Sequence, residues 1–260
     1  MKKEYILFID SGVGGLSTLA ETIKLFPCNY IFYADNAHAP YGSHSKSEIY
    51  EYLKEIIDNL LKSYRIRLVV LACNTATTSS IEKLRKTFSN ILFIGTEPAI
   101  KLASDLGYKN ILCLATPLSS KQEKYIKLAS LQSSSIFTLA IRDFANNIQH
   151  FKLYDSIQNY FNLIKNIALI KKYESKYDAI VLGCTHYVLV SDIIRKYLSR
   201  PLVDGNVGVA KNINNICLKN QIKPINRTNI IFKCSNNCTL ETQKYKKILS
   251  QILANHTNLC

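Results

Sequence analysis

The chain has 260 residues, of which 47% are apolar, so it is large enough for one large or two smaller α/β domains with a substantial core. Its formal net charge of +14 comes from scattered lysines rather than from a basic stripe interleaved with aromatic residues, which argues against a nucleic-acid partner. No apolar run approaches the roughly 18 residues of a membrane span, and Asp10 interrupts the first run too early for a signal peptide. Eight cysteines without a regular framework indicate a reducing, cytoplasmic environment.

A glycine-rich turn follows the first predicted strand. The strand covers residues 5–9, the turn covers 10–15, and a helix pattern follows over 16–25. The turn differs from a dinucleotide-binding fingerprint, because Ser17 stands where the third glycine belongs and Asp10 would oppose a pyrophosphate. Nucleotide binding is therefore disfavoured, and the turn is predicted to offer backbone N–H groups to another anionic group.

A loop with polar side chains follows the second predicted strand, which covers residues 30–34. The loop spans 35–43 and places Tyr41 and Gly42 on the same sheet edge as the first turn. A tyrosine hydroxyl and an unobstructed glycine N–H could bind a carboxylate. Taken alone, a plain Pro-Tyr-Gly turn is the simpler interpretation of this segment. An amphipathic helix is predicted next, over residues 47–63.

One pattern occurs twice in the chain. Residues 68–76 and 179–187 each contain an apolar strand, a small residue, a cysteine and then Asn or Thr, before a helix pattern. We expect Cys73 and Cys184 just beyond the carboxyl ends of buried parallel strands, where α/β sheets place ligand sites. A helix N-terminus is expected to lower the pKa of each thiol toward neutrality. Either cysteine alone could be a core residue, but the repeated context favours two functional thiols.

The rest of the chain continues the alternation of strands and helices. Further strands are predicted at 91–95, 110–115, 136–141, 201–204 and 230–234, and further helices at 98–105, 119–131, 155–175, 191–198, 211–218 and 240–253. The alternation predicts an α/β protein with two similar, mostly parallel domains that face each other across an active-site cleft. Residues 1–96 with 207–260 would form the domain that carries Cys73, and residues 97–206 would form the domain that carries Cys184.

Several motifs, in order and in approximate spacing, resemble the glutamate racemase family. They are Asp10-Ser11-Gly12-Val13-Gly14-Gly15, Pro40-Tyr41-Gly42 after Asp35, Ala72-Cys73-Asn74-Thr75-Ala76, and Gly183-Cys184-Thr185-His186-Tyr187. The resemblance implies a cofactor-independent isomerase that interconverts L- and D-glutamate and supplies D-glutamate for peptidoglycan and cell shape. It implies Cys73 and Cys184 as the acid–base pair, supported by Asp10 and His186. The implied substrate-binding residues are Asp10, Ser11, Tyr41, Gly42, Asn74, Thr75, Thr185 and His186.

The chemistry of racemisation agrees with two thiols. A proton must leave one face of Cα and another must arrive on the opposite face, so one thiol must be ionised while the other is protonated. Without pyridoxal phosphate, the developing carbanion needs N–H groups and hydroxyls aimed at its carboxylate. No motif suggests a pyridoxal lysine, and no metal is assigned to the site.

The chain also departs from the family pattern. The family usually carries a glutamate in an apolar segment of the second domain, and residues 141–150 do not reproduce it, because neither Asp143 nor Gln149 can be aligned with it. Alternative functions are racemisation of aspartate or another amino acid, hydrolysis by Cys184 with His186, and amino-acid binding without catalysis. The sequence allows a homodimer.

A second cysteine pattern lies near the end of the chain. Cys234, Cys238, His256 and Cys260 have a spacing that could bind zinc. We expect unpaired thiols there rather than a metal site, because the residues fall on a strand end and on the chain terminus.

Overall fold

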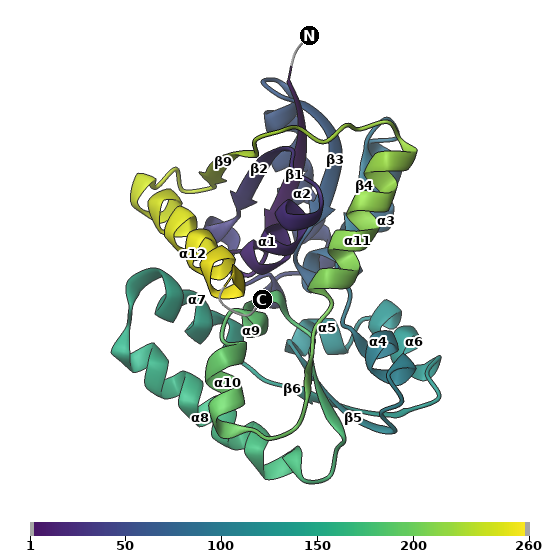
Figure 1. The fold of residues 1–260 in the computed structure, drawn as a ribbon, viewed down its shortest axis with the longest axis vertical. Helices are drawn as coiled ribbons and strands as arrows, with labels where there is room; N and C mark the ends of the chain where they lie inside the picture. Colours follow the sequence, from purple (N-terminus) through teal and green to yellow (C-terminus); the bar gives the residue numbers. More distant parts are fainter. Residues whose placement is uncertain (1–2, 258–260) are drawn as a thin grey trace. The chain divides into compact units, whose positions relative to one another are not determined.

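The chain forms two compact units in a computed structural model, which describes residues 3–257 and their side chains as far as residue 254. The first unit contains the chain up to Thr96 and again from Asn206, and the second contains Glu97–Gly205 (Figure 1). Asn206, placed in the second domain by the sequence analysis, lies with the first unit, where the Thr18 hydroxyl donates to its amide oxygen at 2.8 Å. Each unit is a parallel sheet with helices on both faces, which confirms the predicted α/β class.

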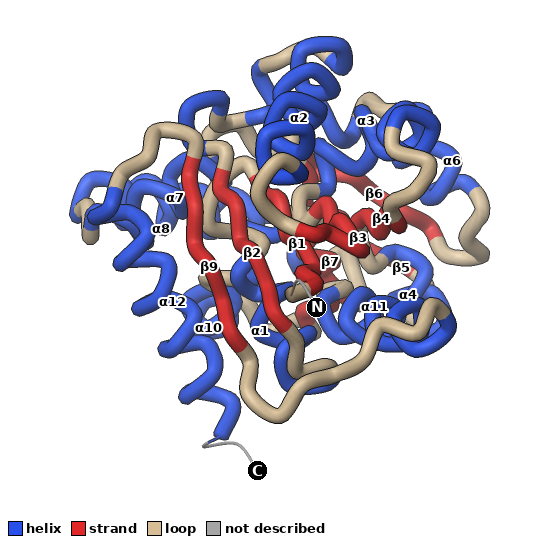
Figure 2. Tube along the Cα trace, turned by 90° about the horizontal axis from the view of Figure 1, so that it is seen from above, coloured by secondary structure: helices blue, strands red, loops and turns tan. Residues whose placement is uncertain are grey.

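The first unit has a five-stranded sheet in the order β4-β3-β1-β2-β9. Its strands are β1 (Glu4–Asp10), β2 (Asn29–Ala34), β3 (Arg65–Leu71), β4 (Leu92–Gly95) and β9 (Asn229–Cys234), and all pair in parallel. Helices α1 (Leu16–Leu25), α11 (Asn206–Lys219) and α12 (Thr239–Thr257) cover one face, and α2 (Lys46–Leu61) and α3 (Asn74–Thr87) cover the other (Figure 2). Because both faces are covered, the central strands are apolar on both sides.

The second unit has a four-stranded parallel sheet in the order β6-β5-β7-β8. The strands are β5 (Asn110–Ala115), β6 (Ser135–Ala140), β7 (Ala179–Leu182) and β8 (Leu202–Val203). The helices are α4 (Ile100–Asp105), α5 (Pro117–Ser120), α6 (Glu123–Ser130), α7 (Phe144–Tyr154), α8 (Ile157–Glu174), α9 (Thr185–Val188) and α10 (Ser191–Tyr197). Alternate side chains of β5 enter two cores: Leu112 and Leu114 pack with α7, α8 and α10, whereas Ile111 and Cys113 pack with α4 and α6.

Helix α7 is the element that the sequence analysis missed. Its buried face is formed by Phe144, Ile148 and Leu153, but Asn146 and Asn147 between them obscure the helical period. The helix begins after Asp143, which has a left-handed φ of 59°, and ends at Asp155, which has a φ of 50°. Tertiary packing against α8 and α9 therefore stabilises a helix that local preference does not favour.

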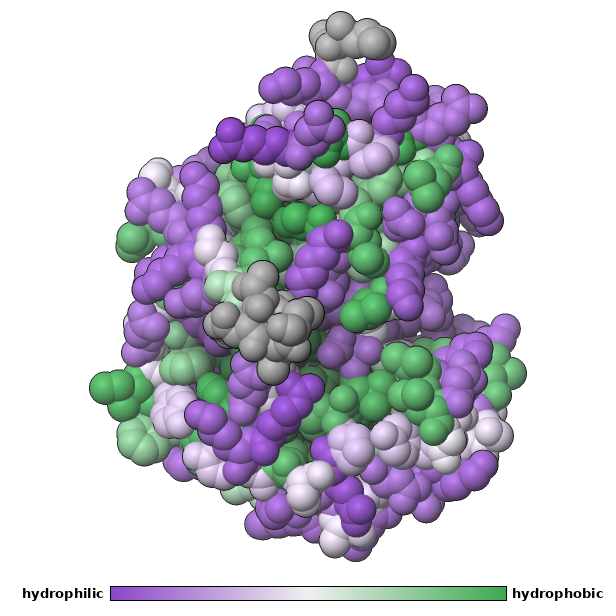
Figure 3. Space-filling view, in the orientation of Figure 1, coloured by the Kyte–Doolittle hydropathy of each residue, from purple (hydrophilic) through white to green (hydrophobic). Residues whose placement is uncertain are grey.

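The surface carries mostly polar side chains on the face shown in Figure 3. Apolar side chains gather in the region of α4 and α6 (Figure 3). Leu102 and Ile126 are exposed on these helices, and Leu106 and Leu131 are exposed directly after them. No helix in the described part of the chain is long and apolar enough to cross a membrane.

A buried carboxylate at the end of α8 holds the segment that leads into β8. Glu174 is 3% exposed and accepts hydrogen bonds from the Ser199 and Arg200 backbone N–H groups and from the Ser199 hydroxyl. Lys171 pairs with its second oxygen at 2.5 Å. Burial raises the pKa of Glu174, but the Lys171 ion pair and the bonds from Arg200 and Ser199 outweigh burial and lower it to about 2.

We expect Glu174→Gln to lower the free energy of unfolding by about 3 kcal/mol at pH 7. The glutamine amide carries no charge, and its NH2 group would compete for the place of an oxygen that accepts the Ser199 and Arg200 N–H groups. The folded-state pKa is depressed, so the contribution is complete above the unfolded value of 4.5 and is lost as the pH falls toward 2. Denaturant titrations at pH 7 and pH 3 should show the difference shrinking by more than half. The matched control Glu82→Gln removes an exposed carboxylate that pairs with Arg85 at 3.0 Å, and it should cost less than about 1 kcal/mol at either pH.

Candidate active site

In each sheet, successive strands are added first on one side of the initial strand and then on the other, so the strand order reverses at one point of the carboxyl edge. In the first sheet β1 lies between β3 and β2, and in the second sheet β5 lies between β7 and β6. Open α/β sheets bind ligands at such switch points. The residues that follow β1 and β3 in the first unit, and β5 and β7 in the second, therefore mark a candidate site in each unit.

Cys73 and Asp10 occupy the switch point of the first unit. Cys73 is the N-cap residue of α3, two positions after the end of β3, and Asp10 is the last residue of β1. The Cys73 Sγ lies 3.8 Å from the Ser11 Oγ, within hydrogen-bond distance for sulfur. The Asp10 Oδ1 accepts the backbone N–H of Gly12 at 2.7 Å, which holds the carboxylate at the start of the glycine-rich turn. The structure thus brings three predicted site residues together: Cys73, Asp10 and Ser11.

The surroundings of Cys73 raise the pKa of its thiol. Burial and the negative charge of Asp10 raise this pKa to about 11, and the N–H groups of Ala76 and Thr75 and the Ser11 hydroxyl oppose the shift only in part. The expectation that the start of α3 brings this thiol toward neutrality is therefore wrong for Cys73. Desolvation of the thiolate and repulsion by a neighbouring carboxylate outweigh the attraction of the helix N-terminus. At neutral pH Cys73 is held as a thiol.

The Tyr41 side chain is held by a hydrogen bond to Asp35, a fully buried aspartate. The Tyr41 hydroxyl donates to Asp35 Oδ2 at 2.7 Å, and the His38 Nδ1 lies 2.9 Å from Asp35 Oδ1. The Asp35 N–H donates to the Asp10 carbonyl oxygen at 2.8 Å, which ties this loop to the switch point. The hydroxyl hydrogen of Tyr41 is thus committed to Asp35. Gly42 is exposed and has no heavy atom within 4 Å of the position that a Cβ would take, so its backbone is unobstructed.

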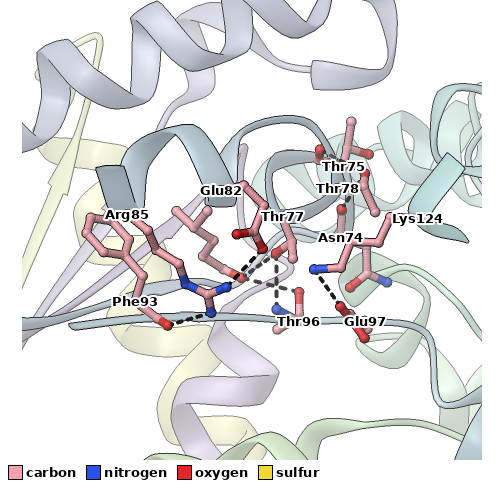
Figure 4. Close-up of polar contacts among 11 residues, drawn as sticks. Asn74, Thr75, Thr77, Thr78, Glu82, Arg85, Phe93, Thr96, Glu97 and Lys124 are labelled. Atoms are coloured by element: carbon pink, nitrogen blue, oxygen red, sulfur yellow. Dashed lines mark hydrogen bonds and ion pairs between the residues drawn. The ribbon is translucent and has the colours of Figure 1, made fainter. Parts of the chain in front are cut away.

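Asn74 and Thr75 open α3 and are buried beside Cys73. Thr77 holds this helix against the sheet: its hydroxyl donates to the Leu71 carbonyl oxygen at 3.2 Å and accepts the Thr96 N–H at 3.1 Å (Figure 4). Cys73 is the N-cap residue of this helix, and Thr77 fixes the helix to the ends of β3 and β4.

Cys184 occupies the corresponding position in the second unit. It follows β7 and is the N-cap residue of α9, which Thr185 and His186 open. Cys184, Thr185 and His186 are all buried. Gly183 is needed here because a Cβ would lie 2.4 Å from the backbone oxygen of Leu114. The absence of a side chain lets the end of β7 approach β5 and sets the position of Cys184.

His186 has a partner that the sequence analysis could not align. Its Nε2 lies 2.9 Å from the amide oxygen of Gln149, a buried residue of α7. Burial lowers the pKa of His186 to about 4, so the ring is neutral at pH 7. An uncharged amide from the segment 141–150 therefore contacts the histidine.

Two polar residues of the second unit escaped the sequence analysis. Thr116 follows β5 and Ser119 lies in α5, both at the switch point beside β7. The Thr116 hydroxyl donates to the Ser119 Oγ at 2.9 Å and accepts the Ser119 N–H at 3.3 Å. The available signal was the Thr116-Pro117 pair, which directly follows the apolar strand predicted at 110–115.

The terminal cysteine pattern is only partly described. The Cys234 Sγ lies 3.6 Å from the Cys238 carbonyl oxygen. Cys260 and the side chain of His256 lie outside the described residues. Within the described residues, no group of three or more His, Cys, Asp or Glu side chains is placed to hold a metal ion.

Known proteins similar to this chain are glutamate racemases. The chain is 38% identical over 212 residues to the glutamate racemase of Aliarcobacter butzleri, covering 78% of this chain and 80% of the relative. It is 31% identical over 260 residues to that of Halothermothrix orenii, covering 94% and 98% of the two chains. No family model matches the chain.

The fold has the same relatives. The structure of Escherichia coli glutamate racemase, in complex with L-glutamate and the activator UDP-MurNAc-Ala, matches with a TM-score of 0.78 at 24% identity and covers 97% of this chain and 96% of that one. The protein is thus an isomerase of the amino-acid racemase class. The chain belongs to the glutamate racemase family.

Proposed function

We propose that this enzyme interconverts L- and D-glutamate, without a cofactor, by acid–base catalysis with Cys73 and Cys184. The observation that supports the proposal is the repeated placement of a buried cysteine at a helix N-cap, at the switch point of each sheet. The mechanism requires the two units to act as domains that present their cysteines to opposite faces of one substrate Cα.

The proton transfers balance in either direction. A thiolate on one side takes the α-proton and becomes a thiol, and the electron pair left on Cα delocalises into the substrate carboxylate. The thiol on the other side gives its proton to the opposite face of Cα and becomes the thiolate. The enzyme therefore ends each turnover in the mirror-image protonation state and is ready for the product enantiomer.

Substrate binding is proposed for the polar groups around the two cysteines. Hydroxyls, amides and N–H groups at the starts of α3 and α9 and in the loop before α2 would hold the substrate carboxylates and stabilise the carbanion. The residues concerned are Ser11, Gly42, Asn74, Thr75, Thr185 and His186, together with Tyr41, which would act through its backbone N–H group because its hydroxyl donates to Asp35. The Asp10 carboxylate would bind the substrate ammonium group. That pairing would offset the negative charge that raises the pKa of Cys73 and would ease formation of its thiolate.

The cellular role that we propose is the supply of D-glutamate for peptidoglycan in the cytoplasm, and hence for cell-wall biogenesis and cell shape. A homodimer is the proposed assembly. The exposed apolar side chains of α4 and α6 support it, because such groups favour burial against a partner.

The test is incubation of the wild-type enzyme with L-glutamate in D2O, following optical rotation and the α-proton NMR signal together. We expect the rotation to fall to zero while deuterium replaces the α-proton. Exchange with unchanged rotation would contradict the two-thiol mechanism, because only one face of Cα would be reached. A constant rotation and a constant α-proton signal would contradict glutamate as substrate. L-Aspartate, tried next, would then separate an aspartate racemase from an amino-acid-binding protein.

A further inference from the structure

We infer that Gln149 is a positioning residue that holds His186 as a neutral imidazole with its hydrogen on Nε2 and its lone pair on Nδ1. The inference deepens the proposed function and depends on it for the part that His186 plays in the reaction. The tautomer itself can be measured without any assay of activity.

Gln149 is one of two buried polar residues of α7, with Asn147, and the other buried side chains of this helix are apolar. These apolar side chains are Phe144, Ile148 and Leu153, and Gln149 is 7% exposed. The Phe144 ring packs on the Tyr187 ring, with centroids 4.6 Å apart, which brings α7 against the turn that carries His186. Burying an amide among apolar side chains costs folding free energy unless the amide is hydrogen-bonded, and His186 supplies such a bond.

The chemistry of the two partners assigns the hydrogen. A glutamine Oε1 only accepts, so the Nε2 of His186 must be the donor across the 2.9 Å separation. A neutral imidazole carries one ring hydrogen, which leaves Nδ1 as an acceptor. Burial is the cause of the lowered pKa of His186, and no charged group contributes to that shift. A carboxylate in place of the amide would instead favour the imidazolium.

The consequence for the reaction follows from where His186 lies. It is two residues beyond Cys184, in the first turn of α9. A ring held in this tautomer can accept a hydrogen bond at Nδ1 from a thiol or from a substrate ammonium group, and it does so without carrying charge. Without Gln149 both tautomers would be populated, and one of them would have no acceptor at Nδ1.

The experiment is long-range 1H–15N correlation NMR at pH 7 on the full chain labelled at its five histidines. The His186 signals are assigned by their loss in His186→Asn. In the wild type we expect a protonated Nε2 and a bare Nδ1. In Gln149→Met we expect averaged nitrogen shifts from mixed tautomers and a kcat lowered about tenfold to 100-fold. Gln149→Glu keeps an acceptor at this place, so it should keep hydrogen on Nε2, raise the pKa of His186 and recover part of kcat.

The matched control is Gln122→Met. Gln122 is another buried glutamine of the second unit, and its Oε1 has no hydrogen-bond partner among the described residues. This variant should leave the His186 spectrum and kcat unchanged. A wild-type ring protonated on Nδ1, or an unchanged His186 spectrum in folded Gln149→Met, would overturn the inference. The expected tautomers in a protein that fails to racemise glutamate would support the inference and overturn the proposed function.

Discussion

Cys73→Ala and Cys184→Ala are each expected to lower the rate of racemisation about 10³-fold, because each variant loses the proton carrier on one face of Cα. Each variant keeps one thiol, which can still remove and return a proton on its own face. In D2O, Cys73→Ala should therefore exchange the α-proton of one enantiomer of glutamate, and Cys184→Ala that of the other. Polarimetry and NMR on both enantiomers measure the two effects separately.

The control for these variants is Cys113→Ala. Cys113 is a fully buried thiol of β5 whose side chain packs in the apolar core with residues of α4 and α6. Its loss should reduce stability slightly and leave the racemisation rate within about twofold of the wild type. Racemisation that survives loss of either Cys73 or Cys184 would rule out the two-thiol mechanism. Tolerance of Cys73→Ala alone would favour a hydrolase that uses Cys184.

Asp10→Asn is expected to lower kcat about 100-fold while lowering the pKa of the Cys73 thiol. The Asp10 charge is one cause of the raised pKa of about 11, so a neutral amide in its place favours the thiolate. Activity should fall all the same, because the substrate ammonium group loses its carboxylate partner. If the variant has a more ionised Cys73 thiol and yet a lower kcat, Asp10 acts through its charge and not only as a structural residue.

The measurement for Asp10→Asn is the rate of alkylation of Cys73 by iodoacetamide as a function of pH, followed by peptide mass spectrometry. The pH at the midpoint of this rate profile should be lower than in the wild type, so alkylation at pH 8 should be faster. The control Asp58→Asn removes a half-exposed carboxylate that pairs with Lys54 on α2, and it should change neither the midpoint nor kcat. An unchanged midpoint in Asp10→Asn would show that the carboxylate does not act on the thiol.

Much of this protein follows from local sequence. Strands that are buried on both faces are apolar without interruption, so β1, β3, β5 and β7 could be predicted from short windows. The residue after such a strand lies at the carboxyl edge of the sheet, wherever the strand pairs. For that reason Cys73 and Cys184 could be named as candidate site residues from the sequence, whereas the role of Asp10 was implied by the family resemblance. The parallel α/β class is confirmed.

Only the tertiary structure decided what surrounds those residues. Gln149 and His186 are 37 positions apart and meet because α7 packs against α9. The sequence of α7 has no clear helical period of its own. The raised pKa of Cys73 likewise depends on burial and on Asp10, which lies beside it through strand pairing and not through sequence. Periodicity reports which face of an element is buried. Desolvation, charge proximity and side-chain hydrogen bonds depend on distances between segments, which folding alone sets.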